Sequence, residues 1–301
     1  MFCLSPMSRK RKLRYKSALC RSGAGLSFGS MTSGADWKDQ VGRSWADNYR
    51  LTDRSFAGLT ERLLGRIGSC EGKSVLDIGC GAGELSLALA RSNPGAQIVG
   101  VDVAPALVEV ARQRGGKHTN LRFEEADAGA WENGAFRPDL LISRHGVMFF
   151  DMPRMAFGHL RGLANPGAEL IFSCFRSPRL NPWASQMASL LKLPQASDPQ
   201  APGPFAFADQ DYVQAILSDA GWLDIELAEV DFAYVAGTGE DPVEDALQLF
   251  TRIGPAAPAL RALEGVARER ALGWMRDWLS EHRSGDIVAL AAAAWIVTAK
   301  A

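Results

Sequence analysis

The sequence predicts an α/β fold in which helices cover both faces of a doubly wound, mostly parallel, seven-stranded sheet. Short apolar runs recur from residue 74 to residue 175, and segments of helical periodicity separate them. A glycine-rich turn follows the first run, and an acidic residue follows each of the next two. Strands that alternate with helices form parallel sheets, whose carboxyl ends share one rim. These glycines and acids should therefore lie side by side.

The composition is that of an ordinary globular protein. The chain has 301 residues, of which 47% are hydrophobic and 22% are charged, and its formal net charge is −1. Seven basic residues and no acid fall within residues 1–30, which leaves residues 31–301 with 26 basic and 34 acidic residues, a charge of −8. This acidic body favours a neutral or cationic substrate over a polyanion, and we expect no nucleic-acid partner.

Residues 1–35 are predicted to be a disordered basic extension. Arg9–Lys16 is a basic run, and Ser22–Ser30 is rich in glycine and serine. Three interpretations remain open for residues 1–30. The segment is a disordered tail or an artefact of start-site choice with Met31 as the initiator, a targeting peptide, or a nucleic-acid-binding tail.

Cysteine usage favours a reducing compartment. The five cysteines are an odd number without a C-x-x-C motif, which argues against a disulfide framework and a zinc site. The four histidines are not clustered, so no metal is expected. No apolar run is long enough to span a membrane. We therefore expect a cytoplasmic protein, with organelle targeting as the alternative if residues 1–30 are a transit peptide.

Residues 36–72 are predicted to form an N-terminal helical cap. Trp37, Val41, Trp45 and Tyr49 recur at helical spacing, and a second apolar stripe runs from Leu59 to Ile67. The pattern is equally consistent with two helices that only pack on the domain. In the cap interpretation, Trp45 and Tyr49 close over the ligand.

Residues 73–175 are predicted to be the ligand-binding core, and Ser74–Glu84 is its first motif. The motif reads as a buried strand, a G-x-G-x-G turn at Gly79, Gly81 and Gly83, and a helix that continues to about Arg91. Glycines permit positive φ and a close approach of ligand to backbone, and the helix start presents free N–H groups. A dinucleotide-binding turn has the different spacing G-x-G-x-x-G.

Two further acids follow predicted strands. Gln97–Asp102 is the second strand, and the carboxylate of Asp102 can accept hydrogen bonds from both hydroxyls of a ribose. Leu121–Glu125 is the third strand, and Asp127 follows it at the same rim. Asp127 can accept a hydrogen bond from an exocyclic amine of adenine, or it can serve only as a turn residue.

The fourth strand, Pro138–Ser143, leads to Arg144 and His145. His145 is a candidate general base because the pKa of histidine lies near neutrality, and its alternative role is that of a pocket wall. Arg144 could orient an acidic or phenolate acceptor, or it could simply pair with Asp151. The fifth strand is Ala168–Phe175.

The remaining chain is predicted to form a substrate lid or loop over residues 176–208 and then the C-terminal half of the sheet over residues 209–301. Prolines punctuate residues 176–208, which could also be a plain linker, and we expect the fold to carry helical lid insertions. Leu223–Val235 and Val288–Thr298 are its last two strands, and the helical insertion 241–283 separates them. Met148, Phe149, Phe150, Trp183 and Phe205 could line an apolar acceptor pocket.

The motifs together resemble class I S-adenosylmethionine (SAM) dependent methyltransferases. The resemblance is carried by Val75–Gly83, Val101–Asp102 and Ala126–Asp127. Ile142–Asp151 and Asn165–Gly167 resemble the small-molecule branch related to ubiquinone and menaquinone C-methyltransferases. Asn181–Trp183, Gly203–Phe205 and Ala294–Thr298 look like a bacterial-type subgroup, which usually has an aromatic residue where this chain has His145.

The resemblance implies a Rossmann-like methyltransferase fold with SAM across the strand tips and a small-molecule methyl acceptor. Gly79–Gly83 would accommodate the methionine part, and Asp77 would order the turn or receive the amino group. Asp102 would hold the ribose and Asp127 the adenine amine. The residues expected at the cofactor are Asp77, Gly79, Cys80, Gly81, Gly83, Asp102, Val103, Asp127, Ala128, Ser143, Trp45 and Tyr49, and the catalytic candidates are His145 and Arg144.

Three functions remain open from the sequence. The first is a SAM-dependent methyltransferase that moves the methyl group to a small molecule by in-line displacement. The second is a non-catalytic SAM- or nucleoside-binding protein on the same fold. The third is an NAD-dependent oxidoreductase, which the glycine spacing disfavours.

Overall fold

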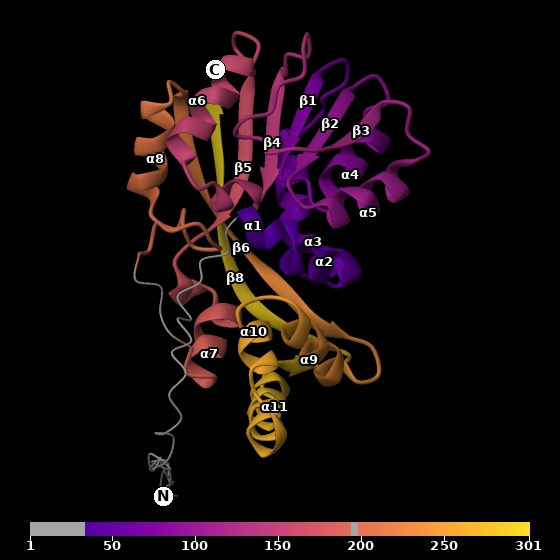
Figure 1. The fold of residues 1–301 in the computed structure, drawn as a ribbon, viewed down its shortest axis with the longest axis vertical. Helices are drawn as coiled ribbons and strands as arrows, with labels where there is room; N and C mark the ends of the chain where they lie inside the picture. Colours follow the sequence, from indigo (N-terminus) through magenta and orange to yellow (C-terminus); the bar gives the residue numbers. More distant parts are fainter. Residues whose placement is uncertain (1–33, 194–197) are drawn as a thin grey trace, which may run out of the picture.

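A computed structural model describes residues 34–193 and 198–301, so residues 1–33 of the predicted basic extension lie outside the described part. The fold is a mixed α/β sheet with helices on both faces (Figure 1). The strands are β1 (Ser74–Ile78), β2 (Gln97–Asp102), β3 (Leu121–Glu125), β4 (Leu140–Arg144), β5 (Glu169–Phe175), β6 (Leu223–Thr238), β7 (Arg283–Ser284) and β8 (Ile287–Lys300).

The strand order is β3-β2-β1-β4-β5-β8-β6, and the two-residue strand β7 pairs with β8 beside this path. Strands β1 to β5 pair in parallel, whereas β8 runs antiparallel to both β5 and β6. The chain crosses from β3 over to β4, which lies on the other side of β1. The predicted mostly parallel, doubly wound sheet is confirmed, and β7 is an addition to the seven expected strands.

The helices are α1 (Gly34–Lys38), α2 (Gln40–Asp47), α3 (Tyr49–Ile67), α4 (Glu84–Ser92), α5 (Pro105–Gly115), α6 (Pro153–Leu163), α7 (Pro182–Leu190), α8 (Gln210–Asp219), α9 (Pro242–Arg252), α10 (Ala256–Arg261) and α11 (Gly265–Ser280), with 3₁₀ turns η1 (Gly146–Phe149) and η2 (Pro178–Leu180). Residues 36–67, which the pattern divided into two helices, form three. The prolines of the expected lid loop include Pro182, which begins α7, because a proline is favoured in the first turn of a helix.

Alternate residues of the central strands pack on opposite faces of the sheet. Val75 belongs to a cluster that includes Leu63 of α3 and Leu89 of α4. Its neighbour Leu76 belongs to the large cluster that includes Phe157 of α6 and Ile216 of α8. Because side chains alternate along a strand, the continuous apolar run of β1 is needed to bury both faces. The packing leaves the carboxyl ends of β1 to β4 facing α1 and α2 (Figure 1).

The strands β6 and β8 are longer than the sequence predicted, and they form an antiparallel ribbon that extends beyond β5. Leu227–Val235 of β6 pair continuously with Ala289–Val297 of β8. Helices α9, α10 and α11 lie along this ribbon on the side of α1 and α2 (Figure 1). The C-terminal half of the chain thereby returns to the rim where β1 and β2 end.

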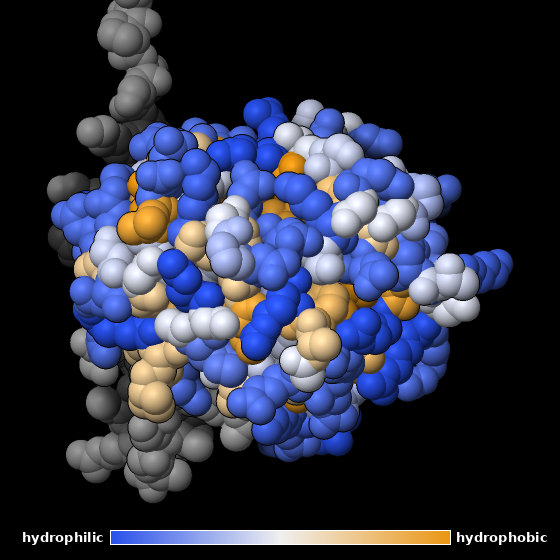
Figure 2. Space-filling model, turned by 90° about the horizontal axis from the view of Figure 1, so that it is seen from above, coloured by the Kyte–Doolittle hydropathy of each residue, from blue (hydrophilic) through white to orange (hydrophobic). Residues whose placement is uncertain are grey.

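The opposite end of the molecule, seen from above in Figure 2, is mostly hydrophilic, and its hydrophobic residues are scattered among hydrophilic ones. Among the residues that the structure describes, none of the helices has the length and apolarity that crossing a bilayer requires.

Candidate functional site

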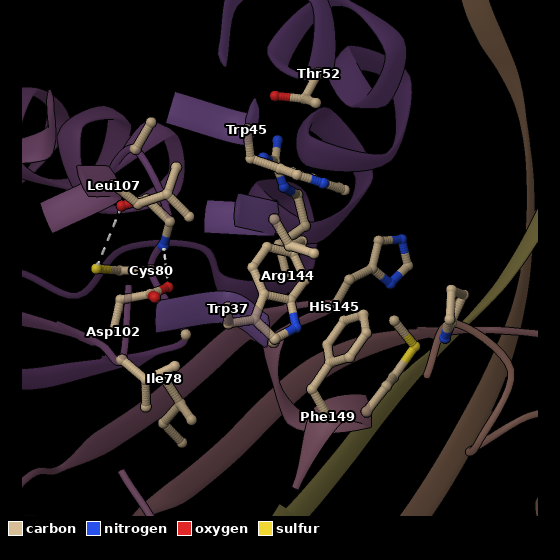
Figure 3. Close-up of a pocket in the computed structure, with 18 of the residues that line it drawn as sticks. Trp37, Trp45, Thr52, Ile78, Cys80, Asp102, Leu107, Arg144, His145 and Phe149 are labelled. Atoms are coloured by element: carbon tan, nitrogen blue, oxygen red, sulfur yellow. Dashed lines mark hydrogen bonds between the residues drawn. The ribbon is translucent and has the colours of Figure 1, made fainter. Parts of the chain in front are cut away.

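A cavity of about 640 Å³ opens where the carboxyl ends of the parallel strands meet α1, α2 and the α9–α10 segment. Its wall includes backbone from the glycine turn and side chains from the ends of β2, β3 and β4. Figure 3 shows Cys80, Asp102 and Leu107 at one end of this cavity and His145 and Phe149 at the other. Chain segments separated by more than 200 residues therefore form one continuous site.

The glycine turn has the backbone conformation that the sequence predicted. Gly79, Gly81 and Gly83 have φ values of 63°, 55° and 82°. A Cβ added at Gly81 would meet no heavy atom within 4 Å, so the backbone there is open to the cavity. Gly83 does not line the cavity. It precedes α4, where an added Cβ would lie 2.7 Å from the ring of Phe123.

Gly79 also permits a close contact with the segment that follows β4. A Cβ at Gly79 would lie 2.8 Å from Cα of Gly146, and a Cβ at Gly146 would lie 2.6 Å from the carbonyl oxygen of Ile78. Both positions therefore require glycine. The contact joins the end of β1 to the turn that carries His145.

Asp77 lines the cavity from within β1 and is 1% exposed. Its Oδ2 accepts a hydrogen bond of 2.5 Å from the hydroxyl of Ser86, which lies on α4. Burial raises the pKa of Asp77 to about 6, against the opposing effects of the Ser86 hydrogen bond and the charge of Arg144. The Ser86 contact supports the predicted role of ordering the turn.

Asp102 is held at the glycine turn by two backbone donors. Its Oδ2 accepts from N–H of Gly81 at 2.8 Å, and its Oδ1 accepts from N–H of Ala104 at 2.9 Å. Burial raises the pKa of this carboxyl, and these hydrogen bonds to the carboxylate oppose the shift. Asp102, Cys80 and Val103 all line the cavity, so the two carboxylate oxygens remain available to a ligand through their other lone pairs.

Asp127 and Ala128 line the cavity beyond β3. Asp127 is exposed, and its Oδ1 accepts a hydrogen bond of 2.8 Å from N–H of Gly129. The two interpretations of Asp127 are therefore compatible, because one oxygen holds the turn and the other has no hydrogen bond among the described residues.

Ser143 was expected at the cofactor but lies behind the cavity wall. Its hydroxyl donates a hydrogen bond of 2.7 Å to the carbonyl of Ile78 and accepts one of 3.1 Å from N–H of Gly146. The side chain is fully buried and is not part of the cavity lining. Because side chains alternate along β4, that of Ser143 points toward β1. Its two hydrogen bonds link the end of β1 to the turn after β4.

Arg144 is engaged with acids other than the expected Asp151. Its guanidinium pairs with Glu84 of α4, donates to Thr60 of α3 at 2.8 Å, and lies 3.8 Å from Asp53. These partners come from helices 60 and more residues away in the chain. Arg144 thus ties α3 to the start of α4, and its charge is compensated without a ligand.

His145 is a left-handed residue at the end of β4, with φ of 66°. The residue is 8% exposed, and neither ring nitrogen has a hydrogen-bond partner among the described residues. Burial first, and then the charge of Arg144, lower the pKa of His145 to about 3. The ring is neutral at pH 7, and both nitrogens are free to bond with a ligand in the cavity.

The two aromatic residues of the expected cap have different positions. Trp45 lines the cavity from α2 (Figure 3). Tyr49 does not, because its ring lies under the guanidinium of Arg114 with 4.5 Å between the centroid and Cζ. Trp37, which the sequence placed only in a helical stripe, lies in Figure 3 between Asp102 and His145.

An aromatic chamber extends from His145 toward the β6–β8 ribbon. Its cavity-lining rings come from α3, β5, α7, β6 and α9, and they are Phe56, Phe175, Trp183, Tyr234 and Phe250. Of the residues suggested for an acceptor pocket, Met148, Phe149, Phe150 and Trp183 line the cavity, whereas Phe205 packs behind Trp183. The sequence offered no local signal for Phe56, Tyr234 or Phe250, because only the folded ribbon and helices bring them together.

Comparison with known proteins gives one family and a set of partial relatives. The model of a family described as a methyltransferase domain matches residues 69–221. A malonyl-[acyl-carrier protein] O-methyltransferase of Paenibacillus is 30% identical over 146 residues, which are 45% of this chain and 53% of that protein. A demethylmenaquinone methyltransferase of Thermus thermophilus is 36% identical over 109 residues, which are 35% of this chain and 49% of that protein.

The fold is also similar to that of a solved enzyme. The Haemonchus contortus phosphoethanolamine N-methyltransferase 2, in complex with S-adenosyl-L-methionine, superposes with a TM-score of 0.54 and 15% identity, covering 88% of this chain and 59% of that one. At this identity the likeness concerns the fold alone. The chain spans about half the length of the curated relatives it matches.

Proposed function

The chain belongs to the methyltransferase-domain family, and we propose that it is a SAM-dependent enzyme that transfers a methyl group to a small-molecule acceptor by in-line displacement. The observation that carries this proposal is the joint position of the open backbone at Gly81 and the carboxylate of Asp102. They are linked by a hydrogen bond of 2.8 Å and both line the cavity.

These residues fit the cofactor by their chemistry. The positive φ and the open surface at Gly81 allow a ligand to contact the backbone without a side chain between them. The acceptor-only carboxylate of Asp102 suits a ribose diol. Asp127 and Ala128 continue the same wall, where an adenine with an exocyclic amine would lie.

When bound, SAM supplies a methyl group that its positively charged sulfur already activates. The protein's task is then to align the acceptor with the methyl group and to exclude water. Trp37 contacts both Trp45 and Phe149 edge to face, at centroid distances of 5.3 and 5.0 Å. This aromatic contact between α1, α2 and η1 covers the middle of the cavity and supports the exclusion of water.

We propose that His145 positions the acceptor as a neutral ring. With a pKa of about 3, it offers one N–H donor and one acceptor lone pair at pH 7. It would bond to the polar group next to the atom that receives the methyl group. Arg144 is assigned a structural role, since its partners are protein carboxylates.

The location that we propose is the cytoplasm. Cys70, Cys80 and Cys174 are free and buried, which fits a reducing compartment. The proposed partners are the cofactor and a small molecule, with no nucleic acid.

Calorimetry of the protein with SAM, S-adenosylhomocysteine and NAD tests the cofactor. We expect binding of the first two and none of NAD, whereas tight NAD binding without SAM binding would contradict the proposal. Untargeted metabolite extracts incubated with protein and SAM then test the reaction. A SAM-dependent mass gain of one methylene in a small molecule is expected, and a SAM-binding protein that methylates nothing in a broad panel would have only the binding function.

A further inference from the structure

The charged groups of the cavity are segregated by position. The carboxylates that line it come from α3, β1, β2 and the segments after β3 and η1, and they are Asp53, Asp77, Asp102, Asp127 and Asp151. Arg144 lines the cavity among these acids, and its charge is compensated by Glu84 and Asp53. A different part of the wall is formed by residues 250–261 of α9, α10 and the turn between them. Its charged lining residues are two arginines, Arg252 and Arg261, and it contains no acid. The wall that residues 250–261 form is therefore locally basic, although residues 31–301 as a whole are acidic.

The charges of these two arginines are uncompensated within the described part of the chain. Arg252 donates through Nη1 to the amide oxygen of Asn48 at 3.0 Å, and its backbone carbonyl accepts from the hydroxyl of Ser44. These contacts hold Arg252 against α2 without neutralising it. Arg261 has no hydrogen bond or ion pair to any described residue, and it is exposed at the cavity mouth.

Between the arginines and His145 the wall is aromatic. Trp183 and Tyr234 stack with 9° between their planes, and Tyr234 and Phe250 with 27°. Burial raises the pKa of Tyr234 to about 12, so its phenol remains neutral. Stacked rings of this kind present flat apolar surface at low entropic cost.

The imidazole of His145, at the end of this wall far from the arginines, has no hydrogen-bond partner among the described residues. Both of its nitrogens are buried, and an unpaired buried polar group is costly. A ligand that fills the chamber would therefore gain by placing one donor or acceptor beside His145.

We propose that the methyl acceptor is an anionic molecule with a flat apolar body. This inference rests on the proposed function. The body lies against Trp183, Tyr234 and Phe250, and the polar group next to its methyl-receiving atom bonds to His145. Its anionic group, such as a carboxylate, binds Arg261 and Arg252 at the mouth. The arginines thereby select anionic acceptors, and they orient the other end of the molecule toward the methyl group.

Three probes with one ring system test the charge preference. They are 2-naphthoate, the neutral 2-naphthamide and the cationic 2-naphthylmethylamine, titrated by calorimetry into protein saturated with S-adenosylhomocysteine. We expect 2-naphthoate to bind about tenfold more tightly than 2-naphthamide, the gain from one charge-assisted hydrogen bond, and the cation to bind most weakly. The preference for 2-naphthoate should fall as NaCl is raised.

Arg261→Gln and a matched control locate the effect. The substitution should remove most of the preference for 2-naphthoate and leave 2-naphthamide binding unchanged. Arg270→Gln, on the exposed surface of α11 and outside the cavity lining, should leave both unchanged. Circular dichroism melting of each variant shows whether it is folded.

Four results with the naphthalene probes would overturn the inference. They are equal affinities for the anionic and neutral probes, a preference for the cation, no effect of Arg261→Gln, and no binding of any naphthalene probe. A loss of S-adenosylhomocysteine affinity in Arg261→Gln would also overturn it, because the arginine would then serve the cofactor. Failure of wild-type protein to bind SAM or S-adenosylhomocysteine is a separate result and counts against the proposed function itself.

Discussion

The imidazole of His145 stacks on the ring of Phe175, with ring centroids 4.0 Å apart and 20° between the planes. The edge of Phe56 closes a second side at 5.4 Å. This packing removes water from the ring, which lines the cavity and whose nitrogens have no partner among the described residues. Because water is excluded, the charged form of the ring is disfavoured, and His145 acts as a neutral hydrogen-bonding group.

The first prediction concerns pH and stability. The pKa of His145 is about 3 in the folded protein and 6.5 when exposed, so between these values the unfolded chain binds a proton that the folded protein does not. The contribution of His145 to the free energy of unfolding is complete above pH 6.5 and is lost as the pH falls toward 3. The loss should reach about 3 kcal/mol at pH 4.

His145→Asn is the matching variant, since asparagine tolerates the left-handed backbone at this position. Asp77 acts with the opposite sign, because its pKa is raised to about 6 and protonation between pH 6 and 3.8 favours the folded state. Asp77 is present in both proteins, so the difference between them isolates His145. Urea unfolding from pH 4 to 8 should show a shallower acid loss in the variant, and parallel curves would contradict the assigned burial.

The second prediction concerns the contact between the glycine turn after β1 and the turn after β4, where Gly79 meets Gly146. In Gly146→Ala, the new methyl group would lie 2.6 Å from the carbonyl oxygen of Ile78 and 2.8 Å from Cα of Gly79. We expect a loss of about 1–3 kcal/mol in the free energy of unfolding and a fall in S-adenosylhomocysteine affinity, because the glycine turn must shift. Urea unfolding and calorimetry measure the two effects.

Gly158→Ala is the control for that substitution. Gly158 lies within α6, where an added Cβ would meet nothing within 4 Å. Alanine is the better helix former there, so this variant should be as stable as the wild type or more stable by about 0.5–1 kcal/mol. Equal behaviour of the two variants would show that the loops are not in contact.

The third prediction assigns Arg144 to structure. Arg144→Gln leaves Glu84 and Asp53 without this partner in a site where the side chains are about one-fifth exposed. Removing one member of such a pair should cost about 3 kcal/mol. A double-mutant cycle with Glu84→Gln should give a coupling energy of about 1 kcal/mol or more. An unchanged stability with lost methyl transfer would instead place Arg144 at the acceptor.

The elements that position the cofactor site were predictable because their signals are local. The apolar run of β1, the glycines after it and the acids after β2 and β3 each lie within a few residues. Parallel strands bring their ends to one rim without further information. Pro182, one of the prolines in the expected lid or loop, begins α7, because proline is favoured in the first turn of a helix.

Side-chain direction and distant partners were not predictable in this way. Ser143 lies at the expected strand end but points toward β1, and Tyr49 lies in the expected cap but packs on Arg114. Arg144 was given a partner nearby in sequence, whereas its partners come from α3 and α4. The aromatic chamber depends on the β6–β8 ribbon, which pairs only after the chain has folded. The division of the chain into cap, core and lid remains a prediction.

The last prediction compares two carboxylates on one cavity wall. Asp102→Asn keeps the shape of the side chain but places an amide N–H₂ against a backbone N–H of Gly81 or Ala104 and removes one of the acceptors for a ribose. It should weaken S-adenosylhomocysteine binding by about tenfold or more, the cost of one charge-assisted hydrogen bond. Asp127→Asn should have a smaller effect, because Asp127 is exposed and competing water weakens its contact with a ligand. Calorimetry at one ionic strength measures the S-adenosylhomocysteine affinity of both variants and so ranks the two effects. If Asp127→Asn is the more damaging, the ribose and adenine positions are reversed, and unchanged affinity in Asp102→Asn would remove the ribose role from that residue.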